Sequence, residues 1–239
     1  MLFEAPLFHD RTDAGHRLGA LLLARGPYEL PLALGLARGG VAVAAEVAQA
    51  LGAPLDVIAV RKIGHPLQPE YAIGAVAPGG AVYVRGPDGL RPSQVDAAVE
   101  DASRRADELD AELHAGRAPL DPEGATAIAI DDGLATGATM IAACRWARSH
   151  GAATVVAAAP VVASACLALV RPEADEVVAL AEQDPFVAVA LWYAEFGAVS
   201  TDDVLRLLEA RRPDAEPGVR APGRDARAPR PRSGGRARG

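Results

Sequence analysis

Short apolar runs alternate with longer amphipathic segments along most of the chain. The runs have the length and composition of buried strands, and they predict strands at 32–36, 55–60, 126–130, 154–159 and 176–180. Between them, apolar residues recur at helical spacing, which predicts helices at 10–24, 41–51, 92–115, 137–149, 163–170 and 202–210. Strands that alternate with helices predict an α/β fold with a doubly wound, mostly parallel sheet.

Two segments depart from this alternation. Residues 61–69 are rich in Pro, Gly and polar side chains and predict a loop. The following runs, 72–76 and 81–84, predict a hairpin that turns at 78–80. Residues 186–196 gather aromatic side chains in a chain that is only 4% aromatic, so this segment has a distinct role.

The composition fits one folded body followed by a tail. Half of the 239 residues are apolar, which is enough for a large core and predicts a folded domain over 1–210. Residues 211–239 hold nine arginines and three acidic residues with almost no large apolar side chain, so we expect a disordered tail. A weak contact with an anionic polymer is the alternative. The whole chain carries a charge of −7, so the body is more acidic still, which argues against nucleic-acid binding.

The chain offers no signal for export or membrane insertion. Its first residues lack the basic and apolar regions of a signal peptide, and Cys144 and Cys166 lack metal-like spacing. The uncharged stretch 152–170 is long enough to raise the question of a membrane span. However, it is rich in alanine, contains Pro160 and fits a strand followed by a helix better. We therefore expect a cytoplasmic protein without membrane contact.

The most informative motif follows the predicted strand at 126–130. Asp131 and Asp132 come directly after this strand, and the Gly/Thr-rich segment 133–139 leads into the next helix. Open α/β sheets bind ligands at the carboxyl ends of their strands. There, carboxylates suit sugar hydroxyls or a hydrated Mg²⁺, whereas the loop and helix start suit a phosphate through backbone N–H groups. The alternative is a turn that only caps a helix, since Asp and Thr are good N-caps.

This segment resembles the phosphoribosyl pyrophosphate (PRPP) signature of type I phosphoribosyltransferases. The resemblance implies a doubly wound sheet with a small hood, in which Asp131 and Asp132 hold the ribose hydroxyls. It also implies that Mg²⁺ is bound to these acids indirectly, through ribose or water. The same resemblance makes the loop the cradle of the 5′-phosphate. The PRPP-binding candidates in it are Gly133, Ala135, Thr136, Gly137, Ala138 and Thr139.

Two further segments resemble the family's leaving-group machinery. Ala37-Arg38-Gly39-Gly40 stands where the family has its pyrophosphate loop, and the resemblance implies a cis or distorted Ala37–Arg38 peptide. Arg61 and Lys62 follow the second strand, and about 61–85 matches the family's mobile loop. Arg38, Arg61 and Lys62 are therefore candidates for neutralising the leaving pyrophosphate. A glycine-rich turn and an ordinary solvated loop are the alternatives.

The acceptor side is less well defined. The resemblance implies a C-terminal hood at about 181–200, where Phe186, Trp192 and Tyr193 are weak candidates for stacking on a base; a hydrophobic cluster that caps the sheet is the alternative. Glu70 is a candidate for catalysis from the mobile loop, against the alternative of a solvated acid. Ala135 stands where 6-oxopurine enzymes of the family place an acid, which disfavours a hypoxanthine/guanine enzyme of that pattern.

The resemblance implies an Mg²⁺-dependent transferase of nucleotide salvage. In that reaction a nitrogen nucleophile, with a nucleobase as the first choice, displaces pyrophosphate from PRPP. A regulatory protein that binds PRPP without turnover is the alternative function. The sequence leaves a homodimer open as the assembly.

Overall fold

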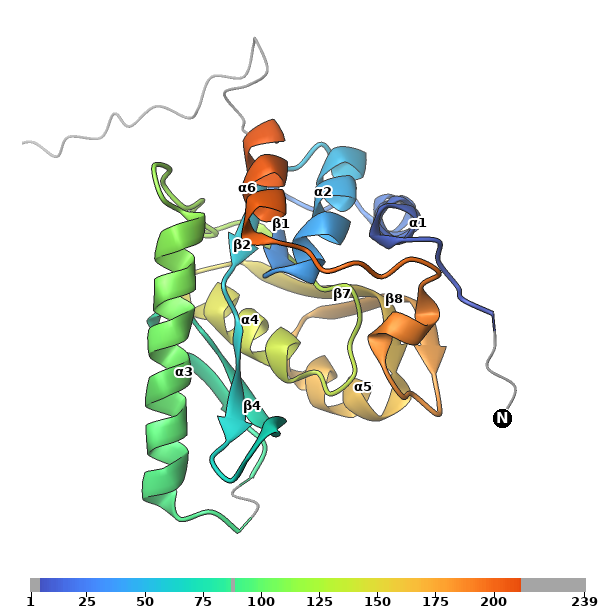
Figure 1. Ribbon diagram of the computed structural model, residues 1–239. Coiled ribbons are helices and arrows are strands. Elements are labelled where there is room, and N and C mark those ends of the chain that lie inside the picture. Colours follow the sequence, from blue (N-terminus) through green and yellow to red (C-terminus); the bar gives the residue numbers. More distant parts are fainter. Residues whose placement is uncertain (1–4, 87–88, 212–239) are drawn as a thin grey trace, which may run out of the picture.

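The computed structural model describes residues 5–86 and 89–211, with the side chains of residues 69 and 70 left out. The predicted tail therefore lies outside the described residues except for Arg211, and both this tail and the domain limits at 1–210 stay predictions. The main sheet has five parallel strands in the order β2-β1-β6-β7-β8 (Figure 1). Their bounds are Pro31–Leu36 (β1), Leu55–Ile58 (β2), Thr126–Ile130 (β6), Thr154–Ala163 (β7) and Glu176–Gln183 (β8). The predicted doubly wound, mostly parallel sheet is confirmed.

Helices cover both faces of this sheet (Figure 1). On one face lie α1 (Arg11–Arg25), α2 (Gly39–Leu51) and α6 (Thr201–Ala210), and on the other lie α4 (Ala138–Ser149) and α5 (Ser164–Val170). Successive strand residues point to opposite faces, so in β1 Ala33 packs with α2 while Leu34 packs with α4. Because both faces are covered, the strands are apolar almost throughout.

A second sheet stands beside the first, in the order β3-β4-β5 (Figure 1). Its strands are antiparallel and span Arg61–His65 (β3), Gln68–Ala77 (β4) and Ala81–Val84 (β5), with the short 3₁₀ turn η1 (Pro78–Gly80) between β4 and β5. The long helix α3 (Pro92–Leu113) packs on this sheet through Ala102 and Ala106, which share one buried cluster with Ile63 and Ile73. The predicted hairpin at 72–76 and 81–84 is confirmed.

The loop predicted at 61–69 is wrong, because the chain forms β3 and the start of β4 there. One large apolar residue, Ile63, is fully buried in this segment and fixes the strand against α3. The pairing shifts register on both sides of Gly64, so the apolar alternation that identifies a strand is interrupted. Strand β2 ends at Ile58, two residues before the predicted end at residue 60.

Strand β7 continues through Pro160 to Ala163, beyond the predicted end at residue 159. Regular pairing with β6 ends at Ala158, and pairing with β8 runs from Val156 to Ala163 but skips Pro160. Proline is tolerated where no ladder bond requires its missing N–H. Strand β8 likewise continues to Gln183, past the predicted end at residue 180.

The segment after β8 forms a small aromatic unit over one end of the sheet. It contains the 3₁₀ turn η3 (Val189–Trp192), and a second such turn, η2 (Arg171–Glu173), links α5 to β8. Tyr193 pairs with Phe8 across an isolated bridge and shares a buried cluster with it. None of the helices in the described part of the chain is long and apolar enough to cross a membrane.

A buried ionic group fastens the end of α3 to the main sheet. Asp56 of β2 accepts bonds from His114 Nε2 (3.2 Å), from the Arg117 guanidinium and from the Leu120 N–H (2.6 Å). Burial opposes the charge on His114, but Asp110 and Asp56 outweigh burial and raise the pKa of His114 to about 9. Burial also opposes the charge on Asp56, yet His114, the Leu120 N–H and Arg117 lower its pKa overall.

Replacing His114 with leucine should lower the free energy of unfolding by about 3 kcal/mol at pH 6, because Asp56 loses a buried cationic partner. The folded-state pKa of His114 lies above the ordinary histidine value of 6.5, so its contribution is complete below that pH and fades as pH rises through about 9. Urea unfolding of the wild type and of His114→Leu from pH 6 to pH 10 should show that the difference between their free energies of unfolding shrinks as pH rises.

The matched control is His16→Leu. His16 Nε2 lies 2.9 Å from Glu46 Oε2, but the His16 side chain is 63% exposed, so its loss should cost less than about 1 kcal/mol. Equal losses in the two variants would contradict the proposed role of the buried group.

Candidate functional site

Two loops meet at the point where the order of the parallel strands reverses. The loop Ala37–Gly40 follows β1, and Asp131 follows the neighbouring strand β6. A Cβ on Gly39 would lie 2.1 Å from Asp132 Oδ2, and one on Gly40 would lie 2.4 Å from the Ile130 carbonyl oxygen. The loops therefore touch only because both positions are glycine. The Ala37–Arg38 peptide is cis, which confirms that expectation.

Asp131 is the more enclosed of the two acids. Its Oδ1 accepts from the Asp132 N–H at 2.9 Å, and its Oδ2 accepts from Thr139 Oγ1 at 3.3 Å. Burial and the charge of Asp132 raise its pKa, which the two bonds and the charge of Lys62 only partly offset. The carboxylate thus faces a shortage of positive charge and of donors, which a ligand could supply.

Asp132 has a partner that the sequence analysis missed. Arg11, in the first turn of α1, places Nε and Nη2 each 2.8 Å from Asp132 Oδ2, and the two side chains are only 12% and 14% exposed. The guanidinium also lies 3.8 Å from the centre of the Phe196 ring and donates to the Gly197 carbonyl oxygen at 2.7 Å. Burial raises the pKa of Asp132, and Arg11 opposes that rise.

A weak sequence signal for Arg11 existed. A basic residue in the first turn of a helix meets the positive end of the helix dipole, which is unfavourable unless another group holds it. Arg11 stands at that position directly after Asp10, whose side chain caps α1 by accepting from the Asp13 N–H.

The segment 133–139 forms the turn into α4 that the motif predicted. Two backbone hydrogen bonds join Leu134 to β7: its N–H donates to the Val161 carbonyl oxygen, and its carbonyl oxygen accepts from the Ala163 N–H. Gly137 has a φ of 76°, a left-handed conformation that favours glycine, and α4 begins at the next residue. Ala135 and Thr136 lie on the turn, and the first N–H groups of a helix lack intrahelical acceptors. These donors can receive an anion.

Basic side chains border the other side of the site. A cavity of about 500 Å³ lies between the two loops and the start of β3; its lining residues are Ala37, Val60, Arg61, Lys62, Arg105 and Thr139. Among the described residues, Arg61 Nε is buried without a hydrogen-bond partner. Burial and the nearby charges of Arg38 and Arg105 lower the pKa of Arg61. The charge of Glu112 offsets these two only in part, so this wall suits an anionic ligand.

The aromatic candidates lie close to the acids but differ in role. Tyr193 is buried, and its hydroxyl donates to the Asp132 carbonyl oxygen at 2.6 Å, so it supports the acid-bearing loop. Phe186 and Trp192 have ring centres 6.0 Å apart. Base binding by these residues stays a prediction. Glu70 lies on β4, but its side chain is outside the described residues.

The protein groups alone do not form a metal site. Within the described ranges, no three or more His, Cys, Asp or Glu side chains are placed to hold a metal ion. Asp131 and Asp132 are two carboxylates, and Arg11 already occupies one oxygen of Asp132. They fit a hydrated cation that takes its remaining oxygens from a bound ligand, as Mg²⁺ commonly does.

A sheet of this order, with two acids and a turn into a helix at its reversal point, has the architecture of a type I phosphoribosyltransferase. A family model described as a phosphoribosyl transferase domain matches residues 22–190, and the chain belongs to this family.

Three relatives support this assignment. Over 219 residues the chain is 45% identical to two Mycobacterium tuberculosis proteins provisionally named as phosphoribosyl transferases, MT0597 (strain CDC 1551 / Oshkosh) and Rv0571c (strain H37Rv). The match covers 89% of this chain and 49% of each relative, so the chain spans about half the length of these curated relatives. The crystal structure of TT1426 from Thermus thermophilus is 35% identical, with a TM-score of 0.72 over 85% of this chain and 98% of that one.

The two acids should respond oppositely to neutralisation. At pH 8, Asp131→Asn should raise the free energy of unfolding by about 1 kcal/mol, because a raised carboxyl pKa means that the charged form costs stability. Burial raises the pKa of Asp132 as well, but Asp132→Asn should still lower the free energy of unfolding, by about 1 kcal/mol, because Arg11 keeps its charge and loses a largely buried partner. Urea titration of each variant measures both, and changes of the same sign would refute this division of roles.

Proposed function

We propose that the protein transfers the 5-phosphoribosyl group of PRPP to a nitrogen nucleophile, with a nucleobase as the first candidate. The main observation in support is the contact between the acid pair and the glycine loop at the strand reversal point, with a basic cavity on one side. The acids suit the ribose hydroxyls, and the α4 turn suits the 5′-phosphate. The cavity lined by Arg61 and Lys62 suits the pyrophosphate.

The chemistry asks mainly for positioning and charge neutralisation. The bond between C1 and the pyrophosphate oxygen breaks, a C1–N bond forms, and the nitrogen loses a proton. Positive charge develops on the sugar while negative charge develops on the leaving group, which Arg38, Arg61 and Lys62 would stabilise. Ala135 offers no carboxylate for the proton, so Glu70 on the β3–β4 hairpin remains the candidate acceptor.

Mg²⁺ would be held by Asp131 and Asp132 through ribose hydroxyls or water, and when bound it would neutralise part of the pyrophosphate charge. The hairpin β3–β4 carries Arg61 and Lys62 at its base, so a closing movement would bring these cations and Glu70 over the sugar. Closure would also exclude water from a reactive sugar cation.

Incubation with PRPP, Mg²⁺ and a panel of nucleobases and small amines tests the reaction. We expect pyrophosphate release that depends on one class of acceptor, measured by a coupled phosphate assay with and without pyrophosphatase. PRPP binding without release by any acceptor would instead identify a regulatory PRPP-binding protein. Failure to bind PRPP would reject the proposal altogether.

The acid pair can be tested separately. Saturating PRPP with Mg²⁺ should stabilise the wild type, by about 2.7 kcal/mol at a concentration one hundred times the Kd. The double variant Asp131→Asn, Asp132→Asn should show no PRPP-dependent rise in Tm, because the ribose loses its acceptors. The control is Asp96→Asn, Asp202→Asn, which removes the same charge from two exposed positions. Stabilisation of the acid-pair variant equal to that of the control would disprove the ribose assignment.

A further inference from the structure

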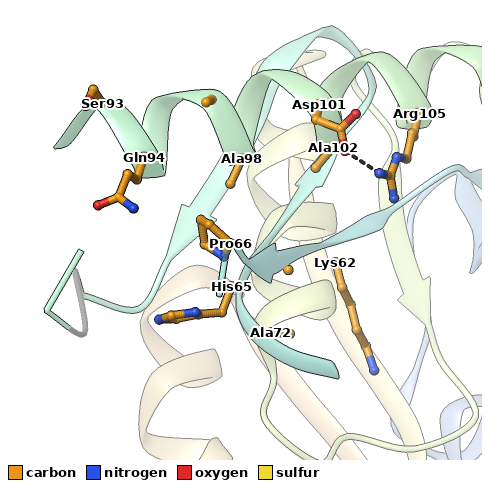
Figure 2. A pocket seen from close by; sticks show the side chains of 12 residues that line it. Lys62, His65, Pro66, Ala72, Ser93, Gln94, Ala98, Asp101, Ala102 and Arg105 are labelled. Atoms are coloured by element: carbon orange, nitrogen blue, oxygen red, sulfur yellow. Dashed lines mark ion pairs between the residues drawn. The ribbon is translucent and has the colours of Figure 1, made fainter. Parts of the chain in front are cut away.

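A second cavity adjoins the basic one. It encloses about 700 Å³ between the β3–β4 hairpin and α3, and its polar lining includes His65, Gln94 and Asp101 (Figure 2). The two cavities share Lys62 of β3 and Arg105 of α3. Figure 2 shows these two residues on the elements that border the space. The basic surface thus continues past the residues expected to hold pyrophosphate.

Arg105 is held where an anion can reach it. Its Nη2 lies 2.5 Å from Asp101 Oδ2, as the dashed line in Figure 2 marks, and the two side chains are 62% and 41% exposed. Such an exposed pair contributes little to stability. Asp101 also pairs with Arg104, so a single carboxylate is shared by two arginines and neutralises Arg105 only in part. A phosphate group could bind the free donors of Arg105 or displace the carboxylate, because guanidinium–phosphate bonds are strong and bidentate.

Several basic side chains gather around the shared wall, and the charge of Glu112 offsets theirs only in part. Arg38 and Arg105 both act on Arg61, and Arg61 Nε is buried without a partner among the described residues. Lys62 lines both cavities together with Arg105, and its charge also acts on Asp131. Lys62 and Arg105 therefore lie where the two cavities join, and Arg61 lines the basic cavity alone.

We propose that this side of the site binds a linear oligophosphate longer than pyrophosphate, with Arg105 holding the phosphate beyond the first two. The ligand is a free oligophosphate or the phosphate chain of a nucleotide. The inference rests on the proposed function only in taking Arg61 and Lys62 as the pyrophosphate contacts. The combined space is much larger than pyrophosphate fills, since one water molecule takes about 30 Å³ in the liquid.

Calorimetric titration with pyrophosphate and with tripolyphosphate, without divalent cations, tests the proposal. The wild type should bind tripolyphosphate at least about tenfold more tightly than pyrophosphate, because a charged fork adds to the contacts. Arg105→Gln should reduce this ratio to about one, because Arg105 borders both cavities and the longer anion loses more contacts with it than pyrophosphate, which keeps Arg61 and Lys62. A ratio that stays unchanged in Arg105→Gln overturns the proposal.

Arg104→Gln is the matched control for net charge. Arg104 lies on the same helix and pairs with the same Asp101, and it does not line either cavity. It should keep the wild-type ratio. An equal loss in both variants would mean that general charge, rather than a built site, attracts the longer anion, and would overturn the proposal. Equal unfolding midpoints of the two variants confirm that both are folded.

Lys62 provides a readout that does not depend on affinity measurements. It is the only lysine in the chain, so acylation adds a single side-chain label that peptide mass spectrometry can locate. Tripolyphosphate should slow this labelling in the wild type at concentrations about tenfold below those needed in Arg105→Gln, because the added fork tightens binding. Equal protection curves would contradict the proposal.

Parallel titrations with a ribonucleoside triphosphate distinguish the two sources of the phosphate chain. Weaker binding of this ligand by Arg105→Gln supports the proposal and shows that a substituted chain fits; an effect on tripolyphosphate alone supports a free chain. An effect on neither overturns the inference. If the wild type releases pyrophosphate from PRPP but does not prefer the longer anion, only this inference fails. If it prefers the longer anion but releases no pyrophosphate from PRPP, only the proposed transfer fails.

Discussion

The contact between Arg11 and Asp132 is the interaction on which the site depends. It joins α1 to the loop after β6, and the same guanidinium reaches the C-terminal aromatic segment through Phe196 and the Gly197 carbonyl. Asp132 in turn leaves no room for a side chain at Gly39. Parts of the chain far apart in sequence are thus fixed around one carboxylate, whose charge would be costly at that depth without a partner.

Charge is left unbalanced on both sides of the site. Asp131 is buried beside a second acid, whereas Arg61 is crowded by Arg38 and Arg105. Unbalanced charges of this kind cluster at functional sites, and a ligand with both hydroxyl donors and anionic oxygens would complement them. A phosphorylated sugar carrying a second phosphate-rich group meets both needs. The group of Asp56, Asp110, His114 and Arg117 shows the contrast, because its two acids and two cations balance one another within the protein.

The sequence predicted the parts of this structure that local patterns determine. Short contiguous segments determine the five parallel strands, the acid-ended turn at Asp131 and the glycine loop at Gly39. Arg11 and Arg105 could not be found in this way, since their importance arises from partners on distant elements. The sequence pattern did not predict strand β3, because this strand has one buried residue, Ile63, and a shifted register in place of the usual apolar alternation.

Helix α3 links the small sheet to the main sheet. Its central residues, Ala102 and Ala106, pack with the small sheet, whereas Leu109 and Leu113 belong to the core of the main sheet. The helix is therefore anchored at one end and carries the small sheet along the rest of its length. Arg105 lies at the boundary between these two packing regions, facing the base of the hairpin. Movement of the hairpin would change the distance from Lys62 to Arg105, so an anion that bridges them would favour one arrangement of the two elements.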